Sequence, residues 1–337
     1  MDPKLKFAKI GGMKVSKICL GLMSYGKFSG PGVARHTWSN PDFDNVFNIM
    51  KAAVNRGVNF FDTANVYSGG DSEVLTGRCL KSLGLRRSEY VLATKLGLPM
   101  NSGPNETGLS RKHIMESVDA SLKRLDLDYV DLLIVHRLDR DTPAEEIMSA
   151  LHDVVKSGKA LYIGASSMYA WEFAKLQQIA QQNGWTKFVS MQNYYNLLYR
   201  EEEREMLPLL QDQNVLCTPW SPLARGVLAR PFSEMRATKR SNEDLYHTSK
   251  QMEDGGVGID TEVLEAVGKV ASDLNQSRAA VSLAWLIHKN CVPVLGATSI
   301  DQLNGSLDAL DISLSNEHVE LLESHYKPKA HGVGVGR

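Results

Sequence analysis

Eight short apolar runs recur along the chain, and they constrain the fold more than any other feature of the sequence. They are continuous rather than alternating, which is typical of strands covered on both faces, as in a parallel sheet. The expected strands are residues 17–21, 58–63, 90–95, 129–136, 160–166, 188–193, 215–220 and 292–297. The sequence therefore predicts a sheet with its hydrophobic faces buried.

Longer stretches with helical periodicity separate the runs. In residues 45–57 the apolar side chains fall on one face of a helix, and Gly57 follows as a stop. In residues 110–128 Ser110 is expected to cap a helix whose apolar stripe begins at Ile114. The alternation of strands and helices predicts an α/β fold.

Eight strand and helix pairs favour a (β/α)8 TIM barrel that forms a single domain over residues 1–337. A doubly wound open sheet shares the alternation and is the structural rival, because only the closing geometry separates the two folds. An open sheet of that kind would usually carry a GxGxxG turn after its first strand. The stretch "CLGLMSYG" at 19–26 does not supply one, so the barrel is favoured.

Three segments fall outside the strand and helix pairs. Residues 1–16 are expected to hold an N-terminal β-hairpin that turns at Gly11 and Gly12 and covers the N-terminal end of the barrel. The polar segment 234–260, after the seventh strand, is too long for an ordinary loop and is expected to form a flap. The glycine-rich residues 329–337 are expected to be a flexible tail.

Composition excludes several classes of protein. The chain is 43% hydrophobic and 23% charged with a net charge of −1, which gives no electrostatic basis for binding nucleic acid. The charged start has no signal-peptide core, and no apolar run is long enough to span a membrane, so a cytoplasmic protein is expected. The four cysteines are widely spaced and no HExxH pair occurs, so no disulfide framework and no metal are expected. The sequence contains no heptad pattern, so it does not indicate an oligomeric state.

Polar, aromatic or glycine residues stand at the end of each expected strand. The C-terminal ends of barrel strands face one mouth, where the catalytic groups of such barrels collect. Each residue alone also fits a structural role, but their coincidence at one face favours a functional site. In chain order they are Gly21 to Tyr25, Asp62 with Tyr67, Lys95, His136, Ser166 with Ser167, Gln192, Trp220 with Ser221, and Gly296 with Thr298.

Four of these residues make chemical sense together. An ammonium at Lys95 would stabilise the phenolate of Tyr67, and lowering the pKa of that phenol by about 3 units corresponds to roughly 4 kcal/mol. Asp62 would pair with Lys95 and keep it protonated, and His136 could hydrogen-bond a substrate oxygen or relay a proton. Such a site protonates an oxygen as negative charge builds on it, for example when hydride adds to a carbonyl.

The chain also resembles the aldo-keto reductase superfamily over essentially its full length, and within it the fungal aryl-alcohol dehydrogenase group. The resemblance is carried by "NFFDTANVYSGGDSE", "LATKLG", "DLLIVHRLD", "YIGASS", "MQNYYNLL" and "PWSPLARGVL". It implies a barrel oxidoreductase that reduces an aldehyde or ketone with NADPH. Tyr67 matches the general acid, Asp62 and Lys95 match its tuning pair, and His136 matches the residue that orients the substrate.

The resemblance also implies residues that bind cofactor and substrate. Ser166 and Gln192 match positions that hold the nicotinamide carboxamide, and Trp220 matches an aromatic residue that stacks on the nicotinamide. The full set expected at the cofactor is Gly21, Met23, Asp62, Ser166, Ser167, Gln192, Trp220, Ser221, Pro222, Leu223, Arg225, Gly226, Arg230, Gly296, Thr298, Ser299, Gln302 and Ser306. An aromatic or apolar carbonyl compound is expected as substrate, with contacts from Tyr25, Trp38, His136 and Tyr195.

Two positions depart from the family pattern. Ser167 stands where the family usually has asparagine, which weakens one contact expected at the carboxamide. Relatives selective for NADPH commonly carry arginine or lysine near Thr298, Ser299 or Gln302, and none of these three is basic. NADPH is favoured, and NADH remains open.

Three other functions have some basis in the sequence. "GLMSYGKF" at 21–28 resembles a phosphate-binding loop, but Phe28 stands where a hydroxyl must bind magnesium. A barrel metal hydrolase would need several histidines and carboxylates at strand ends, and only His136 and Asp62 qualify. Some members of the superfamily act as redox-sensing regulatory partners of membrane channels, and the motifs here fit that role as well.

Overall fold

The structure is a computed structural model that describes residues 7–27, 39–234, 260–330 and 335. The expected flap, apart from its first and last residues, and most of the expected tail lie outside these residues. Within them, no helix joins the length and the apolarity that a membrane crossing would require.

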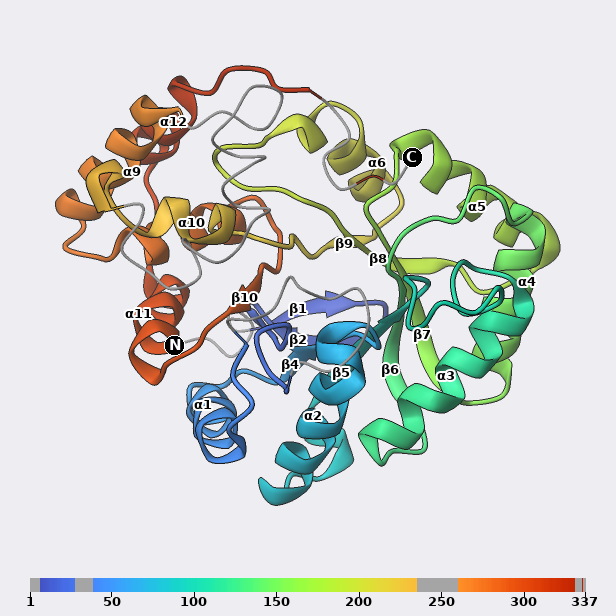
Figure 1. Cartoon of the computed structure of the whole chain (residues 1–337). Coiled ribbons are helices and arrows are strands. Elements are labelled where there is room, and N and C mark those ends of the chain that lie inside the picture. The colour runs from blue at the N-terminus through green and yellow to red at the C-terminus, as the bar shows by residue number, and fades with distance from the viewer. Residues whose placement is uncertain (1–6, 28–38, 235–259, 331–334, 336–337) are drawn as a thin grey trace.

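Eight parallel strands form one curved sheet at the centre of the described chain (Figure 1). Their order is β10-β3-β4-β5-β6-β7-β8-β9, so neighbours along the chain are neighbours in the sheet. Each predicted strand is confirmed at its place. The bounds are β3 Cys19–Gly21, β4 Phe60–Asp62, β5 Val91–Leu96, β6 Val130–Val135, β7 Ala160–Ser166, β8 Phe188–Gln192, β9 Leu216–Cys217 and β10 Val294–Gly296.

Hydrogen bonds between the first and last strands of that order close the sheet. The amide of Val292 donates to the carbonyl of Cys217 at 3.0 Å, and the amide of Val294 donates to the carbonyl of Pro219 at 2.9 Å. Their two-residue spacing is that of a parallel ladder. The closed ring confirms the (β/α)8 barrel and excludes the open doubly wound sheet.

Helices surround the sheet in Figure 1. The cap predicted at Ser110 is confirmed, because its side chain accepts from the amide of His113 at 3.3 Å. The helix predicted over 45–57 is also confirmed, with Val46, Ile49 and Met50 buried against the barrel. The bounds are α1 Phe43–Asn55, α2 Asp71–Ser82, α3 Arg111–Leu125, α4 Ala144–Lys156, α5 Ala170–Asn183, α6 Met206–Asp212, α9 Thr261–Asp273, α10 Arg278–His288, α11 Ile300–Leu307 and α12 Asn316–Ser324.

The predicted N-terminal hairpin is confirmed as β1 (Phe7–Ile10) paired with β2 (Met13–Ser16). Its turn requires Gly11, which has a φ of +55° and lies so close to Tyr162 that a Cβ would come within 2.6 Å of the ring. Ile10 and Val15 pack into one apolar cluster with barrel residues such as Phe60. This cluster fills the barrel at the end where the strands begin.

Shortening Ile10 tests whether the hairpin is part of the core. The Ile10 side chain is fully buried, so we expect Ile10→Ala to lower the free energy of unfolding by about 2–5 kcal/mol in urea denaturation. The neighbouring Lys9→Ala, on the exposed face of β1, should change it by less than about 0.5 kcal/mol. Equal effects of the two changes would mean that the hairpin does not seal the barrel.

Candidate active site

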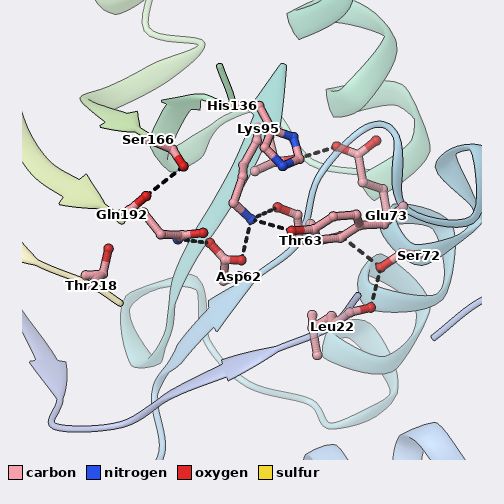
Figure 2. A network of polar contacts seen from close by, with 12 residues as sticks. Leu22, Asp62, Thr63, Ser72, Glu73, Lys95, His136, Ser166, Gln192 and Thr218 are labelled. Atoms are coloured by element: carbon pink, nitrogen blue, oxygen red, sulfur yellow. Dashed lines mark hydrogen bonds and ion pairs between the residues drawn. The ribbon is translucent and has the colours of Figure 1, made fainter. Parts of the chain in front are cut away.

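The ammonium of Lys95 lies at the centre of the polar groups at the C-terminal ends of the strands (Figure 2). The Lys95 side chain, at the end of β5, has no exposed surface. It donates to Asp62 Oδ1, to the carbonyl of Thr63 at 2.8 Å and to the hydroxyl of Tyr67 at 3.2 Å. An ammonium has three N–H donors, so this buried cation is fully hydrogen-bonded.

Asp62 is the buried counter-ion of Lys95, and both of its oxygens are engaged. Its Oδ1 pairs with Lys95, and its Oδ2 accepts from Gln192 Nε2 at 3.0 Å. The carboxylate therefore joins β4 to both β5 and β8 across the barrel, as Figure 2 shows. Burying a charged pair is tolerated only with such additional hydrogen bonds.

Tyr67 and His136 face one another beside Lys95. Tyr67 begins the short helix η2 (Tyr67–Gly70), and His136 directly follows β6. Their rings meet edge to face, with centroids 5.7 Å apart and an interplanar angle of 86°. Lys95 Nζ also lies 4.8 Å from the centroid of the Tyr67 ring. The four residues predicted as a tetrad are thus brought together.

Burial dominates the protonation of this group. It raises the pKa of Tyr67 above its usual value, although Lys95 pulls in the opposite direction. Lys95 does lower the pKa of this phenol, as expected, but burial outweighs it, so the expected net lowering of the Tyr67 pKa is wrong. For Lys95 itself, burial opposes the charge but the attraction of Asp62 prevails, and its pKa is raised. Burial, helped by the cations of Arg137 and Lys95, holds the pKa of His136 well below its usual range.

The residues expected at the nicotinamide form a second linked group next to the tetrad. Ser166 Oγ donates to the carbonyl of Gln192 at 2.7 Å, and the indole Nε1 of Trp220 donates to Ser167 Oγ at 3.0 Å. Trp220 also packs on Tyr194, with ring centroids 4.6 Å apart. Because Gln192 bonds to Asp62, the two groups are continuous.

Two segments expected at the dinucleotide have distinct backbone features. After Trp220, the backbone takes left-handed φ angles at Ser221, Ala224, Arg225 and Gly226, of 49°, 46°, 59° and 100°. Turns with such angles orient successive amides and are common at sites that bind anions. At the start of α11, Ser299 caps the helix by accepting from the amide of Gln302 at 3.2 Å.

The remaining cofactor predictions lie around these segments. Gly21 and Gly296 are register partners at the ends of β3 and β10. Thr298 donates from both its amide and its hydroxyl to Gln302 Oε1, at 3.1 and 2.9 Å. Ser306 is buried farther along α11. Met23, Pro222, Leu223 and Arg230 lie in the loops that follow β3 and β9.

Two aromatic residues expected at the rim are buried in the core instead. Tyr25 is 1% exposed, and its hydroxyl donates to the carbonyl of Ala297 at 2.8 Å. Tyr195 has no exposed surface, packs on Trp285 and donates to Glu203 Oε1 at 2.7 Å. In this structure, neither ring has appreciable exposed surface at which it could meet a substrate. Trp38 lies outside the described residues.

Three residues of the site were missed from the sequence. The carbonyl of Thr63 accepts from Lys95, which no side-chain pattern could indicate. Arg137 Nη1 donates to the carbonyl of His136 at 2.5 Å, and its guanidinium lies 5.8 Å from the Trp220 ring. Asn193 accepts from the amide of Ser167 at 3.0 Å. Arg137 and Asn193 each directly follow a predicted site residue at a strand end. That position in the sequence could have indicated both of them.

Comparison with known proteins gives the family of this closed parallel barrel. Residues 17–327 match the profile of the aldo/keto reductase family. Over 97% of its length the chain is 43% identical to versiconal hemiacetal acetate reductase of Aspergillus parasiticus, covering 98% of that protein. It is 42% identical to a Schizosaccharomyces pombe protein provisionally named an aryl-alcohol dehydrogenase, over 94% of each chain. Aldo-keto reductase AMT2 of Alternaria alternata is 41% identical over 84% of this chain and 83% of its own.

The chain therefore belongs to the aldo/keto reductase family, as its motifs indicated. It is an oxidoreductase that reduces small carbonyl compounds and uses a nicotinamide cofactor, as the family generally does. The three relatives are named as reductases or dehydrogenases. They give no support to the alternative of a regulatory channel partner.

The lowered pKa of His136 predicts how stability depends on pH. A histidine whose folded pKa is depressed binds fewer protons than in the unfolded chain, so stability falls as pH drops through the unfolded value. With an unfolded pKa of about 6.5, this group should cost about 2 kcal/mol between pH 7 and pH 5. In urea denaturation His136→Asn should lose that much less stability over this interval.

The matched control is His288→Asn, because His288 is exposed near the end of α10. Its loss of stability between pH 7 and pH 5 should equal that of wild type. If His136→Asn instead shows the wild-type loss, the imidazole is not held neutral by the fold.

Proposed function

We propose that the protein reduces an aldehyde or ketone to the alcohol with NADPH, and that Tyr67 is the general acid. One observation carries the proposal. The Tyr67 hydroxyl lies 3.2 Å from the buried ammonium of Lys95 and its ring packs against His136, at the carboxyl ends of neighbouring strands.

The raised pKa of Tyr67 suits the role of a proton donor. The phenol stays protonated at neutral pH, since burial holds its pKa above the usual value. An alkoxide formed from a carbonyl is more basic than a phenolate, so transfer of the phenol proton to it is downhill. Lys95 then stabilises the phenolate that remains, because its ammonium already donates to that oxygen.

A neutral His136 suits the role of holding the carbonyl oxygen. Its Nδ1 is one of the few buried side-chain nitrogen and oxygen atoms in the described chain that have no hydrogen-bond partner. A neutral imidazole has one donor and one acceptor nitrogen. We assign one ring nitrogen to donate to the substrate oxygen beside Tyr67, which would align the carbonyl for protonation.

The donor groups at the mouth fit a nicotinamide dinucleotide. The left-handed turn at 221–226 would place amides, with Arg225, around the pyrophosphate. Ser166, Ser167 and Gln192 would hold the carboxamide, and Trp220 would pack on the nicotinamide ring. When bound, the reduced nicotinamide supplies the hydride.

The adenosine end would bind at the start of α11, where a helix N-terminus favours an anion. Thr298, Ser299 and Gln302 provide hydroxyls and an amide but no cation, so a 2′-phosphate would be held by neutral donors. We assign NADPH as the preferred cofactor because the family typically uses it, and the lack of a cation is the reason we expect NADH to be used as well.

The substrate class follows from the rings that remain at the mouth. With Tyr25 and Tyr195 buried, the rings that remain at the mouth are Tyr67 and His136 of the tetrad and Trp220 of the neighbouring nicotinamide group. Relatives are named for aryl alcohols and for versiconal hemiacetal acetate. We therefore propose an aromatic or flat apolar carbonyl compound as substrate.

Removing the Tyr67 hydroxyl tests the general acid. We expect Tyr67→Phe to lower kcat at least about 100-fold in NADPH oxidation with substituted benzaldehydes, because the developing alkoxide loses its proton donor. Binding of NADPH, followed by fluorescence titration, should change little. Tyr162→Phe, at the opposite end of the barrel beside the hairpin, is the matched control and should keep its turnover. Wild-type turnover in Tyr67→Phe would contradict the role of Tyr67 as general acid.

A cation at the start of α11 tests where the adenosine phosphate binds. We expect Thr298→Arg to increase the preference for NADPH over NADH, measured as the ratio of kcat/KM values. A charge-assisted hydrogen bond of about 1–3 kcal/mol corresponds to roughly 5- to 150-fold. Asn316→Arg adds the same charge at the start of α12, and there the ratio should stay at the wild-type value. An unchanged ratio in Thr298→Arg would mean that the phosphate binds elsewhere.

A further inference from the structure

A buried carboxyl group outside the tetrad connects to the nicotinamide side of the site. Glu202 lies in the short helix η4 (Glu201–Glu203) and is 4% exposed. Its Oε2 accepts a hydrogen bond from Asn193 Nδ2. Asn193 directly follows Gln192 at the end of β8, so the loop that carries Glu202 reaches the barrel mouth.

Asn193 in turn holds two segments of the expected nicotinamide site. Its Oδ1 accepts from the amide of Ser167 at 3.0 Å, and its carbonyl accepts from the amide of Trp220 at 2.9 Å. Ser167 has a φ of +53°, which a residue with a Cβ adopts only when its surroundings hold it there. In this conformation Ser167 Oγ accepts from the Trp220 indole at 3.0 Å.

Glu202 determines which way the Asn193 amide points. An ionised carboxylate can only accept, so it requires the NH₂ group of Asn193 to face it. The amide oxygen must then face Ser167, where it meets the backbone N–H. Without an acceptor at residue 202 the amide could turn over, and an NH₂ group would oppose the N–H of Ser167.

We infer that Glu202 is a positioning residue that acts through Asn193 to fix Ser167 and Trp220 for the nicotinamide. The inference rests on the proposed function and deepens it, because it adds a support that lies behind the residues assigned to the cofactor. The chain of hydrogen bonds runs from Glu202 to Asn193, from Asn193 to Ser167 and from Ser167 to Trp220. Glu202 itself does not touch the cofactor in this arrangement.

The same group makes the arrangement sensitive to pH. Burial raises the pKa of Glu202 to about 7, with the Asn193 hydrogen bond opposing the shift and the charge of Glu201 adding to it. Within the described chain, the thiol of Cys217 on β9 also interacts with Glu202, and its pKa is raised, so the thiol remains neutral near pH 7. Glu201 is bonded to Arg204, Tyr326 and Lys329. Near pH 7 the change of charge therefore falls on Glu202.

The sign of the pH effect follows from the donor and acceptor roles. Below pH 7 a protonated Glu202 can itself donate, so Asn193 is no longer held in one orientation. Above pH 7 the carboxylate accepts only, and Ser167 and Trp220 are fixed. NADPH should therefore bind more tightly at pH 8 than at pH 6.

The test compares Glu202→Leu and Glu202→Gln with wild type by fluorescence titration of NADPH at pH 6 and pH 8. Glu202→Leu should raise Kd about 10-fold at pH 8, the loss of about one hydrogen bond, with a larger rise in KM for NADPH than fall in kcat. Like a protonated Glu202, the amide in Glu202→Gln can both accept and donate, so this variant should show the pH 6 affinity of wild type at both pH values and lose the pH effect. The exposed Glu205→Gln is the control and should behave as wild type. Protonation of the NADPH phosphate changes Kd equally in wild type and in the variants, so its contribution cancels when their pH effects are compared.

A second measurement needs no cofactor. The Trp220 indole N–H signal in a nitrogen-15 NMR spectrum, assigned by its loss in Trp220→Phe, should shift with a midpoint about pH 7 in wild type. It should not shift in Glu202→Gln. A shift that persists in this variant, or no shift in wild type, overturns the inference even if Glu202→Leu fails to fold.

The two proposals fail in different ways. If wild type binds NADPH equally well at pH 6 and pH 8, and Glu202→Leu binds it with the same affinity, then the positioning role alone is overturned. Wild-type protein that binds no NADPH overturns the proposed function, and the positioning role is lost with it.

Discussion

The buried ammonium of Lys95 is the interaction on which the geometry of the site depends. A charge without exposed surface can persist only if every donor has an acceptor, and Asp62, Thr63 and Tyr67 supply the three. These acceptors come from the end of β4 and from the turn that follows it, while Lys95 comes from β5. Satisfying one cation therefore fixes the position of Tyr67 relative to two strands.

The two ends of the barrel interior differ in polarity. At the end where the strands begin, Ile10 and Val15 of the hairpin pack on Phe60 and exclude water. At the other end the interior is polar, and its groups satisfy one another from Ser166 through Gln192 and Asp62 to Lys95. Sealing one end with apolar contacts leaves the mouth as the place where buried polar groups can meet a ligand.

The sequence predicts elements better than it predicts burial. Eight strands were predicted correctly because a continuous apolar run is a local signal. The four residues expected as a tetrad lie together because parallel strands bring their ends together. The burial of Tyr25 could not be predicted, since its partner, the carbonyl of Ala297, is 272 residues away. The sign of the pKa shift at Tyr67 failed for the same reason, because it depends on how much of the ring the folded chain encloses.

The raised pKa of Tyr67 and the lowered pKa of His136 have one cause, and together they define the chemistry available. Burial favours the neutral form of each, so a protonated phenol stands beside an uncharged imidazole. In such a pair the phenol is the group whose proton an alkoxide can take, while the imidazole can only orient the oxygen. The ammonium of Lys95, which would stabilise a phenolate at Tyr67, is already in place beside its oxygen. The proposed proton donation would therefore require no rearrangement of charged groups, which is the physical sense in which the site is preorganised.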